Sequence, residues 1–393
     1  MTDFEGAPVS IMECRILVVE DSVPIRRVIG AYLKSAGLLN VEFAEDGVIG
    51  LEKVSLYNPD LVILDIRMPN LDGYGFLKKL RNDPDRADLP VLVQTAYSDP
   101  EERNKAFIEG GTDLITKPIN GVELLARVNI HLENRMLLRS LKAYRNRLED
   151  ELNAARKMQE AMLPSPSLIA DIEQNIGIEI KSFFEPSSEL GGDFWGLQFI
   201  DDERMGVFIV DFSGHGVNSA LNTFRLHTLM DSTDMPVDNP AAYMTVLNKK
   251  LHALIPRGQF ATMFYGVIDS KNNTLTYSAA ASTSPVIGSK GTDKFVFHDA
   301  SGLPLGITEK AIYSNNQIAF NRGSYLFLYS DALIETAGTE HDMLDEDGLA
   351  DLITAGLTSA TEKHTFSHIL DTFNAGVSRP LPDDLTVLWL ERP

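Results

Sequence analysis

The sequence predicts two folded domains of different class joined by a long helix. The first is an α/β doubly wound domain with a five-stranded parallel sheet, and the second is an α+β sandwich. Three observations lead to this prediction: strand and helix patterns alternate early in the chain, apolar residues follow a heptad spacing near its middle, and short strands alternate with turn residues after it. With 393 residues, 44% of them hydrophobic, the chain has enough apolar material for two cores.

The first domain is expected over residues 14–135. An apolar run at residues 16–19 ends in two acids, as a buried parallel strand does at the carboxyl edge of its sheet. Similar runs occur at residues 41–43, 61–64, 91–95 and 113–115, and each is followed by a helical pattern. Five strand–helix units of this kind predict a doubly wound sheet whose ligands bind at the carboxyl ends of the strands.

Polar residues at these strand ends form a candidate phosphoryl-transfer site. Glu20, Asp21 and Asp65 supply carboxylates, and Thr95 and Lys117 supply a hydroxyl and an ammonium group. Crowded carboxylates repel one another unless a hard cation is present, and oxygen ligands suit Mg²⁺. Asp65 is then the expected nucleophile toward a phosphoryl donor. One acid at a strand end is more often a helix cap, so the inference rests on the set.

The first domain resembles the receiver domains of bacterial response regulators. The resemblance rests on Glu20-Asp21, Asp65 with Met68-Pro69 and Asp72-Gly73, Thr95-Ala96 and Lys117-Pro118. It implies that Asp65 accepts a phosphoryl group from a sensor histidine kinase or phosphotransfer protein. It also implies that Glu20 and Asp21 hold Mg²⁺ and that Thr95 and Lys117 contact the phosphoryl group.

One position departs from the receiver pattern. Three residues before the lysine, where the family usually has a switching Tyr or Phe, this chain has Leu114. We therefore expect the signal to leave the receiver by a route other than the usual aromatic side chain.

A helical coiled-coil linker is expected over residues 136–164. No Gly or Pro occurs between residues 122 and 163, so the last receiver helix is expected to continue into this segment. Spacings of three and four residues define a seam with polar residues at Arg145 and Gln159. Its apolar members are Leu138, Leu141, Leu148, Leu152, Ala155 and Met162. The seam predicts a parallel homodimer; the alternative is a helix that packs on its own domain. Pro164 and Pro166 end the helix.

The second domain is expected over residues 165–393. Strand patterns occur at residues 178–184, 193–200, 205–212, 261–269, 274–279, 325–330 and 386–390. Helical patterns occur at residues 219–230, 241–254, 347–355 and 365–375. Many antiparallel strands with helices between them predict a sandwich with helices on its outer faces.

Four aspartates at the ends of these strands form a second candidate metal site. Asp193 follows two glycines, Asp211 leads into a Gly-rich turn, Asp331 follows an aromatic strand, and Asp383 precedes the last strand. Glycine lets the backbone approach whatever the neighbouring acid binds. Two divalent cations need carboxylates from separate segments, and such a pair can activate water for attack on phosphate. Each Gly-Asp pair alone is more often only a turn.

From about residue 155 onward, the chain resembles the PP2C-type serine/threonine phosphatases of the bacterial SpoIIE and RsbU branch. The matching motifs are Gln159 with Leu163-Pro164, Gly191-Gly192-Asp193, Asp211 with Ser213-Gly214-His215-Gly216, the segment 261–267, the segment 302–306, Ser330-Asp331 and Asp383-Asp384-Leu385-Thr386. The resemblance implies two Mn²⁺ or Mg²⁺ ions held by Asp193, Asp211, the Phe212 carbonyl, Asp331 and Asp383.

Three positions near this set stay open or depart from the family. Asp384 is a further candidate ligand beside Asp383, and His215 is read as a turn or packing residue. Where relatives carry Asn-Ala-Gly-His, residues 279–282 read Ala-Ala-Ala-Ser. This loop lies outside the metal set, so we expect a change of substrate preference rather than loss of activity. Phe194 after Gly-Gly-Asp excludes a diguanylate cyclase signature.

The expected function is a two-component response regulator whose output is a metal-dependent protein serine/threonine phosphatase. Phosphorylation of Asp65 would control it, and the resemblance implies a phosphorylated anti-sigma factor antagonist as the substrate. The alternative is a catalytically silent adaptor that binds a sigma factor or anti-sigma factor, which would have no reason to keep Asp193, Asp211, Asp331 and Asp383 together. An enzyme acting on Asp65 itself is a weaker candidate, because the site suits stable phosphoesters.

The amino-acid composition argues against some classes of binding partner and indicates an expected location. The formal net charge of −21 argues against a nucleic-acid or anionic membrane surface. A single cysteine, Cys14, permits no disulfide within the chain, and no apolar run has the length of a membrane span. We therefore expect a cytoplasmic protein.

Overall fold

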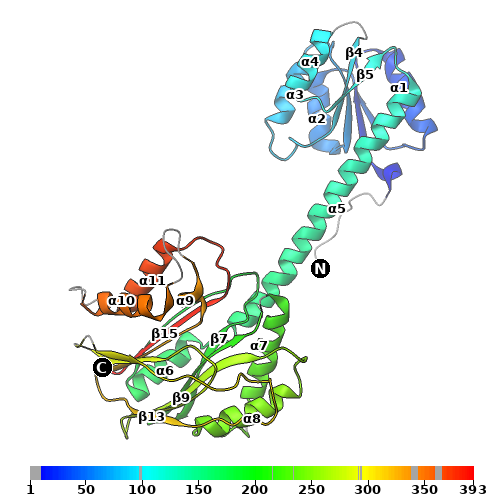
Figure 1. The fold of residues 1–393 in the computed structure, drawn as a ribbon. Coiled ribbons are helices and arrows are strands. Elements are labelled where there is room, and N and C mark those ends of the chain that lie inside the picture. Colours follow the sequence, from blue (N-terminus) through cyan, green and yellow to red (C-terminus); the bar gives the residue numbers. More distant parts are fainter. Residues whose placement is uncertain are drawn as a thin grey trace. The chain divides into compact units, whose positions relative to one another are not determined.

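The computed structural model describes residues 10–96, 100–214, 216–232, 234–290, 292, 294–337, 344–358 and 365–393. It divides into two compact units, Met1–Glu149 and Asp150–Pro393 (Figure 1). The boundary falls within the predicted linker, inside the last third of a continuous helix, Gly121–Glu160.

The first unit has the predicted parallel sheet. Its strands are β1 (Ile16–Val19), β2 (Val41–Ala44), β3 (Leu61–Asp65), β4 (Val91–Ala96) and β5 (Asp113–Lys117). They lie in the order β2-β1-β3-β4-β5, which confirms the doubly wound topology. The central strands are buried on both faces, because helices cover both sides of the sheet and form a separate apolar cluster on each.

Five helices complete this unit: α1 (Val23–Ser35), α2 (Gly47–Tyr57), α3 (Gly73–Arg81), α4 (Pro100–Ile108) and the first part of α5 (Gly121–Glu160). Side-chain caps define two of their starts. Asp46 accepts hydrogen bonds from the backbone N–H groups at the start of α2, and Asp72 accepts one at the start of α3. The 40-residue α5 confirms that the last receiver helix continues into the linker without a break.

The linker part of α5 exposes several predicted seam residues. Leu138, Leu141 and Leu148 are 55%, 64% and 43% exposed, whereas Leu152 and Ala155 are half-buried. The seam nevertheless ends earlier than predicted. Helix α5 stops at Glu160, and Met162 packs against the core of the second unit. Met162 is therefore reassigned from the dimer seam to that core, where its apolar side chain gains more burial.

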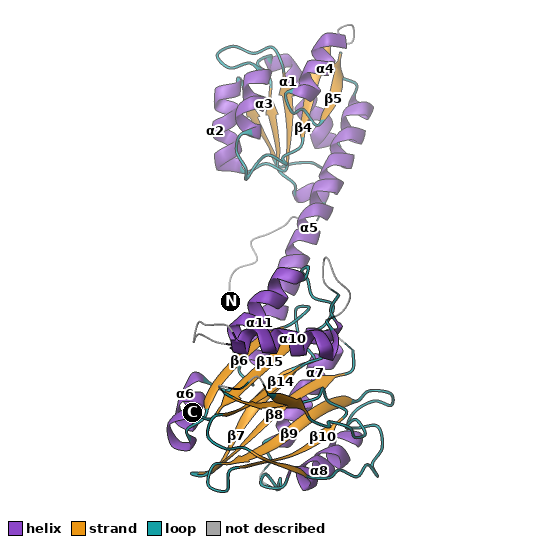
Figure 2. Cartoon of the chain, turned by 60° about the vertical axis from the view of Figure 1, so that its left-hand side comes forward, coloured by secondary structure: helices purple, strands orange, loops and turns teal. Residues whose placement is uncertain are grey.

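The second unit is a sandwich of two five-stranded sheets (Figure 2). The first sheet has the order β13-β10-β9-β8-β7 and the second the order β12-β11-β14-β15-β6. Their strands are β6 (Glu179–Glu185), β7 (Phe194–Asp201), β8 (Arg204–Phe212), β9 (Ala261–Asp269), β10 (Thr274–Ala280), β11 (Val286–Ser289), β12 (Phe295–Phe297), β13 (Asn316–Ala319), β14 (Ser324–Tyr329) and β15 (Leu385–Glu391). All pairings are antiparallel, in agreement with the predicted α+β class.

Helices cover both outer faces of this sandwich. The helices are α6 (Pro166–Ile176), α7 (Val217–Met230), α8 (Pro240–His252), α9 (Ala332–Glu335), α10 (Asp345–Thr358) and α11 (Thr365–Gly376). One apolar cluster lies between α7, α8 and the first sheet, a second between the sheets, and a third under α9 to α11.

The sequence patterns missed α6, the four-residue helix α9 and the three short strands β11, β12 and β13. Ser165 caps α6 and Pro166 occupies its first turn, so a start signal was present. The strands have only three or four residues, which is too short for a clear alternation.

Candidate phosphoacceptor and metal sites

The receiver site brings together the predicted residues from separate strand ends. Lys117 Nζ lies 2.8 Å from Asp65 Oδ1 and 3.1 Å from Glu20 Oε2. Ligand oxygens of Glu20, Asp21 and Asp65 all lie within 4.8 Å of one another. Strands β1, β3 and β5 run parallel, so their carboxyl ends share one edge of the sheet. The arrangement fits a hard divalent cation beside a phosphoacceptor carboxylate.

Burial shifts the pKa of a carboxyl group at this edge of the sheet. Glu20 is only 1% exposed, and its pKa is raised by burial and by the nearby Asp65 carboxylate, while Lys117 opposes the shift. The Thr95 side chain is buried, and its hydroxyl has no hydrogen-bond partner within the described residues. An unpaired buried hydroxyl costs free energy unless it gains a partner. Phosphoryl oxygens on Asp65 would be such a partner.

The second site draws its acids from both sheets of the sandwich. Asp193 precedes β7 and Asp211 lies in β8, and these two strands pair beside the acids. Asp331 follows β14 and Asp383 precedes β15, and these strands also pair. Each sheet therefore contributes two acids. The four predicted acids come together, since the Asp211 and Asp331 carboxyl groups each feel the charge of Asp383.

Burial, and after it the charges of neighbouring carboxylates, raises the pKa values of these acids. Burial and the neighbouring Asp211 carboxyl raise the pKa of Asp193 well above its usual range. Burial, followed by the charges of Asp331 and Asp383, raises the pKa of Asp211 to about 8. The pKa of Asp331 rises to about 6 for the same reasons. Carboxylates that repel one another so strongly suit a site that binds cations.

The second site is less compact than the receiver site. Across the described ranges, the receiver acids are the only group of three or more whose ligand atoms lie within 4.8 Å of one another. A cation that drew the acids of the second site together would offset the repulsion that contributes to their raised pKa values. The donor set of carboxylates and a backbone carbonyl at Phe212 suits Mg²⁺ or Mn²⁺.

Asp384 occupies a different position from its neighbour Asp383. Asp384 is buried, and its Oδ1 accepts hydrogen bonds from the backbone N and the hydroxyl of Ser187 at 2.6 and 2.9 Å. Its Oδ2 accepts a short hydrogen bond from the Gly192 N–H. Both oxygens already hold the loop before β7, so we assign Asp384 to positioning this loop and leave direct coordination to Asp383.

Backbone packing places the Phe212 carbonyl beside the same loop. A Cβ atom on Gly192 would lie 3.2 Å from the Phe212 oxygen and 3.1 Å from the Ser219 side chain. Glycine at this position therefore allows the close approach that the sequence motif indicated.

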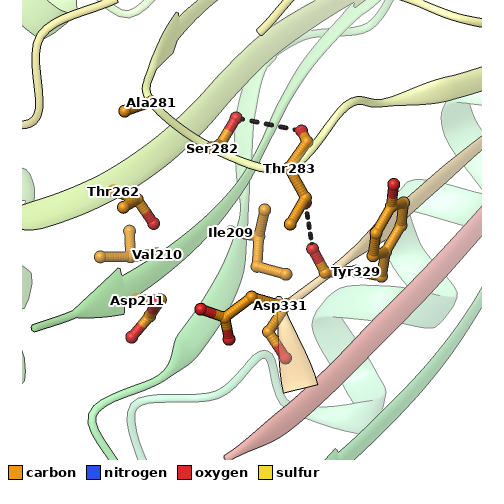
Figure 3. Close-up of a pocket in the computed structure, with 10 residues that line it drawn as sticks. Ile209, Val210, Asp211, Thr262, Ala281, Ser282, Thr283, Tyr329 and Asp331 are labelled. Atoms are coloured by element: carbon orange, nitrogen blue, oxygen red, sulfur yellow. Dashed lines mark hydrogen bonds between the residues drawn. The ribbon is translucent and has the colours of Figure 1, made fainter. Parts of the chain in front are cut away.

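A small pocket of about 60 Å³ opens beside the acids. Figure 3 shows the Asp331 carboxyl group pointing toward Asp211, with the loop that carries Ala281, Ser282 and Thr283 on the opposite wall. The Thr283 hydroxyl donates a short hydrogen bond to the Tyr329 carbonyl and anchors this loop. The loop that departs from the family pattern thus lines the pocket.

Several residues of this site were not predicted. The Thr386 hydroxyl donates a 2.8 Å hydrogen bond to Asp193 Oδ2, and the Ser330 hydroxyl links β14 to β15. Ser330 directly precedes Asp331 and Thr386 follows Asp383 by three positions, so both belong to the matching motifs, but the sequence assigned them no role. Gln159 was assigned to the seam, but its side chain is buried in the second unit against Gly191. His215 lies outside the described residues.

Comparisons with known proteins agree with both units. A receiver-domain family model matches residues 16–129, and the model for stage II sporulation protein E (SpoIIE) matches residues 201–393. The chain is 28% identical over 230 residues to phosphoserine phosphatase RsbP of Bacillus subtilis, covering 56% of this chain and 55% of that protein. It is 40% identical over 140 residues to response regulator MprA of Mycobacterium ulcerans, covering 36% of this chain and 54% of that protein. The chain thus spans about half the length of these relatives.

A solved structure gives the same fold for the second unit. The SiaA-PP2C domain of Pseudomonas aeruginosa superposes with a TM-score of 0.55 at 20% identity, covering 63% of this chain and 98% of that one. At this identity the likeness shows the fold alone. No helix among the described residues combines the length and apolar character needed to cross a bilayer. The chain joins a response regulator receiver domain at residues 16–129 to a SpoIIE-family domain of the PP2C type at residues 201–393.

Proposed function

We propose that this protein is a response regulator whose output domain is a metal-dependent phosphoserine/phosphothreonine phosphatase. The observation that carries this proposal is the cluster of Asp193, Asp211 and Asp331, whose raised pKa values mark a site built for cations. A binding module would gain nothing from this repulsion.

The residues of the second site have distinct roles. Asp193, Asp211, Asp331 and Asp383, with the Phe212 carbonyl, would hold the two cations. Two divalent cations supply the positive charge that polarises a phosphoryl group and lowers the pKa of an attacking water. The Thr386 hydroxyl donates to Asp193 Oδ2 and so fixes the orientation of this carboxylate. With both cations bound, the site would support direct attack of water on the phosphoester, without a covalent enzyme intermediate.

The substrate is proposed to be a phosphorylated protein of the anti-sigma factor antagonist class. The similarity to a phosphoserine phosphatase supports the chemical class of the substrate. The pocket beside Asp331 is small and open to one side, which suits a single phosphorylated side chain presented by a protein surface. Ser282 on its far wall is placed to influence which substrates fit.

We propose that phosphorylation of Asp65 regulates the output domain and that the signal passes from the receiver to this domain through α5. A histidine kinase or phosphotransfer protein would phosphorylate Asp65, and Lys117 would then contact the added phosphoryl group. Lys117 ends β5 and lies shortly before the start of α5. Salt bridges from Arg127 to Asp113 at 2.7 Å and from Arg135 to Asp88 at 2.8 Å attach this helix to the receiver. Rearrangement at Lys117 would therefore change the position of α5.

The exposed seam on α5 is proposed to pair with a second copy of the chain. Leu138, Leu141 and Leu148 remain exposed at heptad spacing, and burying them against the same residues of a partner would remove apolar surface from water. Receiver phosphorylation would change the register or the strength of this pairing.

The test is Mn²⁺-dependent hydrolysis of a generic aryl phosphate and of a phosphoserine peptide by the full-length protein, with and without beryllofluoride as a mimic of phosphorylated Asp65. We expect turnover that requires metal, changes with beryllofluoride and is lost in Asp211→Asn. Absence of turnover on both substrates in both states would refute the enzyme and favour a silent adaptor. Full activity of Asp211→Asn would refute the assigned site.

A further inference from the structure

Five of the large apolar side chains that the second unit exposes lie in three chain segments. The segments are the start of α7, the loop 253–260 between α8 and β9, and the stretch 302–308. The five residues are Val217, Leu221, Leu254, Leu303 and Ile307, each between 46% and 52% exposed. Single exposed apolar residues are normal on a protein surface, whereas a contiguous group of them marks an interaction site.

Hydrogen bonds join the three segments to one another. Asn222 Nδ2 in α7 donates a 2.7 Å hydrogen bond to Gln259 Oε1 in the loop 253–260. Directly after this loop, the backbones of Ala261 and Leu305 exchange hydrogen bonds of 3.0 and 2.8 Å. Because each segment is bonded to the next, the exposed apolar side chains belong to one surface. We call these three segments, with the side chains that they expose, the rim.

The rim adjoins the pocket beside the acids. Ser213 lies two positions after Asp211, and its backbone N–H donates a 3.0 Å hydrogen bond to the Phe260 carbonyl at the end of the loop. The Phe260 N–H in turn donates to the Ser213 hydroxyl at 3.1 Å. Asp211 is paired with Thr262 across β8 and β9, and both residues line the pocket (Figure 3). A protein that presents a phosphorylated side chain to this pocket would therefore cover the rim.

Two exposed arginines give the rim a positive charge. Arg225 Nη1 donates a 2.9 Å hydrogen bond to Asn222 Oδ1, which holds its guanidinium toward the loop that carries Arg257. Within the described part of the chain, no carboxylate forms an ion pair with either arginine. Glu309, just beyond the stretch 302–308, lies 3.8 Å from Lys249 and is offset by it. Unpaired guanidinium groups beside apolar side chains suit a partner that bears carboxylates.

We propose that the rim is the docking surface for the phosphoprotein substrate and that it selects substrates with carboxylates and apolar side chains beside the phosphoserine. The inference rests on the proposed function and adds the residues that determine its specificity. Apolar contacts with Leu221, Leu254 and Leu303 would hold the substrate, and the arginines would distinguish acidic from basic partners. A chain of net charge −21 would otherwise favour basic substrates, so a preference for acidic ones is diagnostic of the rim.

The test compares two synthetic phosphoserine peptides of equal length, each with a leucine near the phosphoserine. Glutamates flank the phosphoserine in one peptide and lysines flank it in the other. We measure kcat/KM for phosphate release by the full-length protein with Mn²⁺. Two exposed ion pairs worth about two- to fivefold each predict a preference for the glutamate peptide of about 4-fold to 25-fold, which falls as salt is added. Equal rates, or a preference for the lysine peptide, would overturn the proposal.

Charge reversal identifies the arginines that are responsible. We expect the double variant Arg225→Glu/Arg257→Glu to prefer the lysine peptide and to hydrolyse para-nitrophenyl phosphate as the unsubstituted protein does. Arg322→Glu, at an exposed position between β13 and β14, is the matched control and should keep the preference for the glutamate peptide. A double variant that keeps this preference would overturn the role of the arginines. If the double variant loses aryl phosphate hydrolysis, Arg257→Glu alone should still lower the preference about twofold or more.

The apolar part of the rim has its own variant. Leu303→Ser should raise KM for both peptides by the same factor and leave kcat, the charge preference and aryl phosphate hydrolysis unchanged. An unchanged KM for both peptides would remove Leu303 from the docking surface.

A binding measurement separates this inference from the proposed function. Fluorescence anisotropy of labelled peptides with the full-length protein in a chelator requires no turnover. If the protein hydrolyses neither the aryl phosphate nor the peptides, the proposed function fails. Tighter binding of the glutamate peptide, reversed in the double variant, would then still support the rim. If metal-dependent hydrolysis of the aryl phosphate is present without any charge preference in rate or binding, only the inference about the rim fails.

Discussion

Replacing Asp211 by Asn should stabilise the metal-free protein, although it removes a residue of the proposed active site. The pKa of Asp211 is raised from 3.8 to about 8 by burial and by Asp331 and Asp383. At pH 7 the folded protein therefore holds this carboxyl protonated, while the unfolded chain ionises it. A raised folded pKa contributes stability that is present below the unfolded pKa and is lost as the pH rises toward the folded one.

The magnitude follows from the interval between the two pKa values. Each pKa unit corresponds to about 1.4 kcal/mol, and the interval from the unfolded pKa to pH 7 is roughly three units, which gives about 4 kcal/mol. Asp193 shares a hydrogen bond with Asp211, so part of this shift belongs to the pair. We expect Asp211→Asn to raise the unfolding free energy by about 2–4 kcal/mol at pH 7 without metal, with a gain that grows by about 1.4 kcal/mol per pH unit between pH 5.5 and 7.5.

The assay is urea unfolding in a chelator, followed by tryptophan fluorescence. The chain has two tryptophans, Trp195 and Trp389, and both lie in the second unit, so the signal reports on the unfolding of that unit. Asp202→Asn, an exposed site on the same domain, is the control and should change little. Addition of Mn²⁺ should stabilise the unsubstituted protein more than Asp211→Asn. Equal or lower metal-free stability of Asp211→Asn at pH 7 would refute the assignment of the acids as a repelling cluster.

Three further predictions concern the pocket loop, the loop before β7 and the linker. Ala281 has a backbone φ of 52°, a left-handed conformation that is unfavourable for a residue with a Cβ. Ala281→Gly should therefore raise the unfolding midpoint by an amount equivalent to about 1 kcal/mol, and a lower midpoint would contradict this conformation. Asp384→Ala should leave the Ser187 and Gly192 N–H groups without their acceptor and reduce Mn²⁺ affinity about 10-fold or more, measured by titration; unchanged affinity would refute its positioning role. Leu141→Asp should convert a dimer into a monomer, as measured by sedimentation velocity. Glu133→Asp, at another exposed position of α5, is the control, and a dimer that persists in Leu141→Asp would place the interface elsewhere.

Local sequence patterns predicted most of the helices and strands, and they also predicted which acids lie at the strand ends. The sheet of the first unit follows from five apolar runs alternating with helical patterns, and the parallel-sheet rule brings Glu20, Asp65 and Lys117 together although 97 positions separate Glu20 from Lys117. Local pattern failed for the short strands β11 to β13, because three or four residues carry no reliable alternation.

The spacing of apolar residues indicates where strands end, and it was therefore enough to predict the class of each domain and which acids would gather. Residues that look alike in the sequence could be told apart only from their contacts in the folded protein. Asp383 and Asp384 are neighbours of the same type, yet Asp384 has both oxygens taken by N–H groups of a distant loop. Gln159 and Met162 share the heptad spacing of Leu141, yet Gln159 is buried in the second unit and the half-buried Met162 packs against its core. Such choices depend on contacts with chain segments far away in sequence, which no local spacing records.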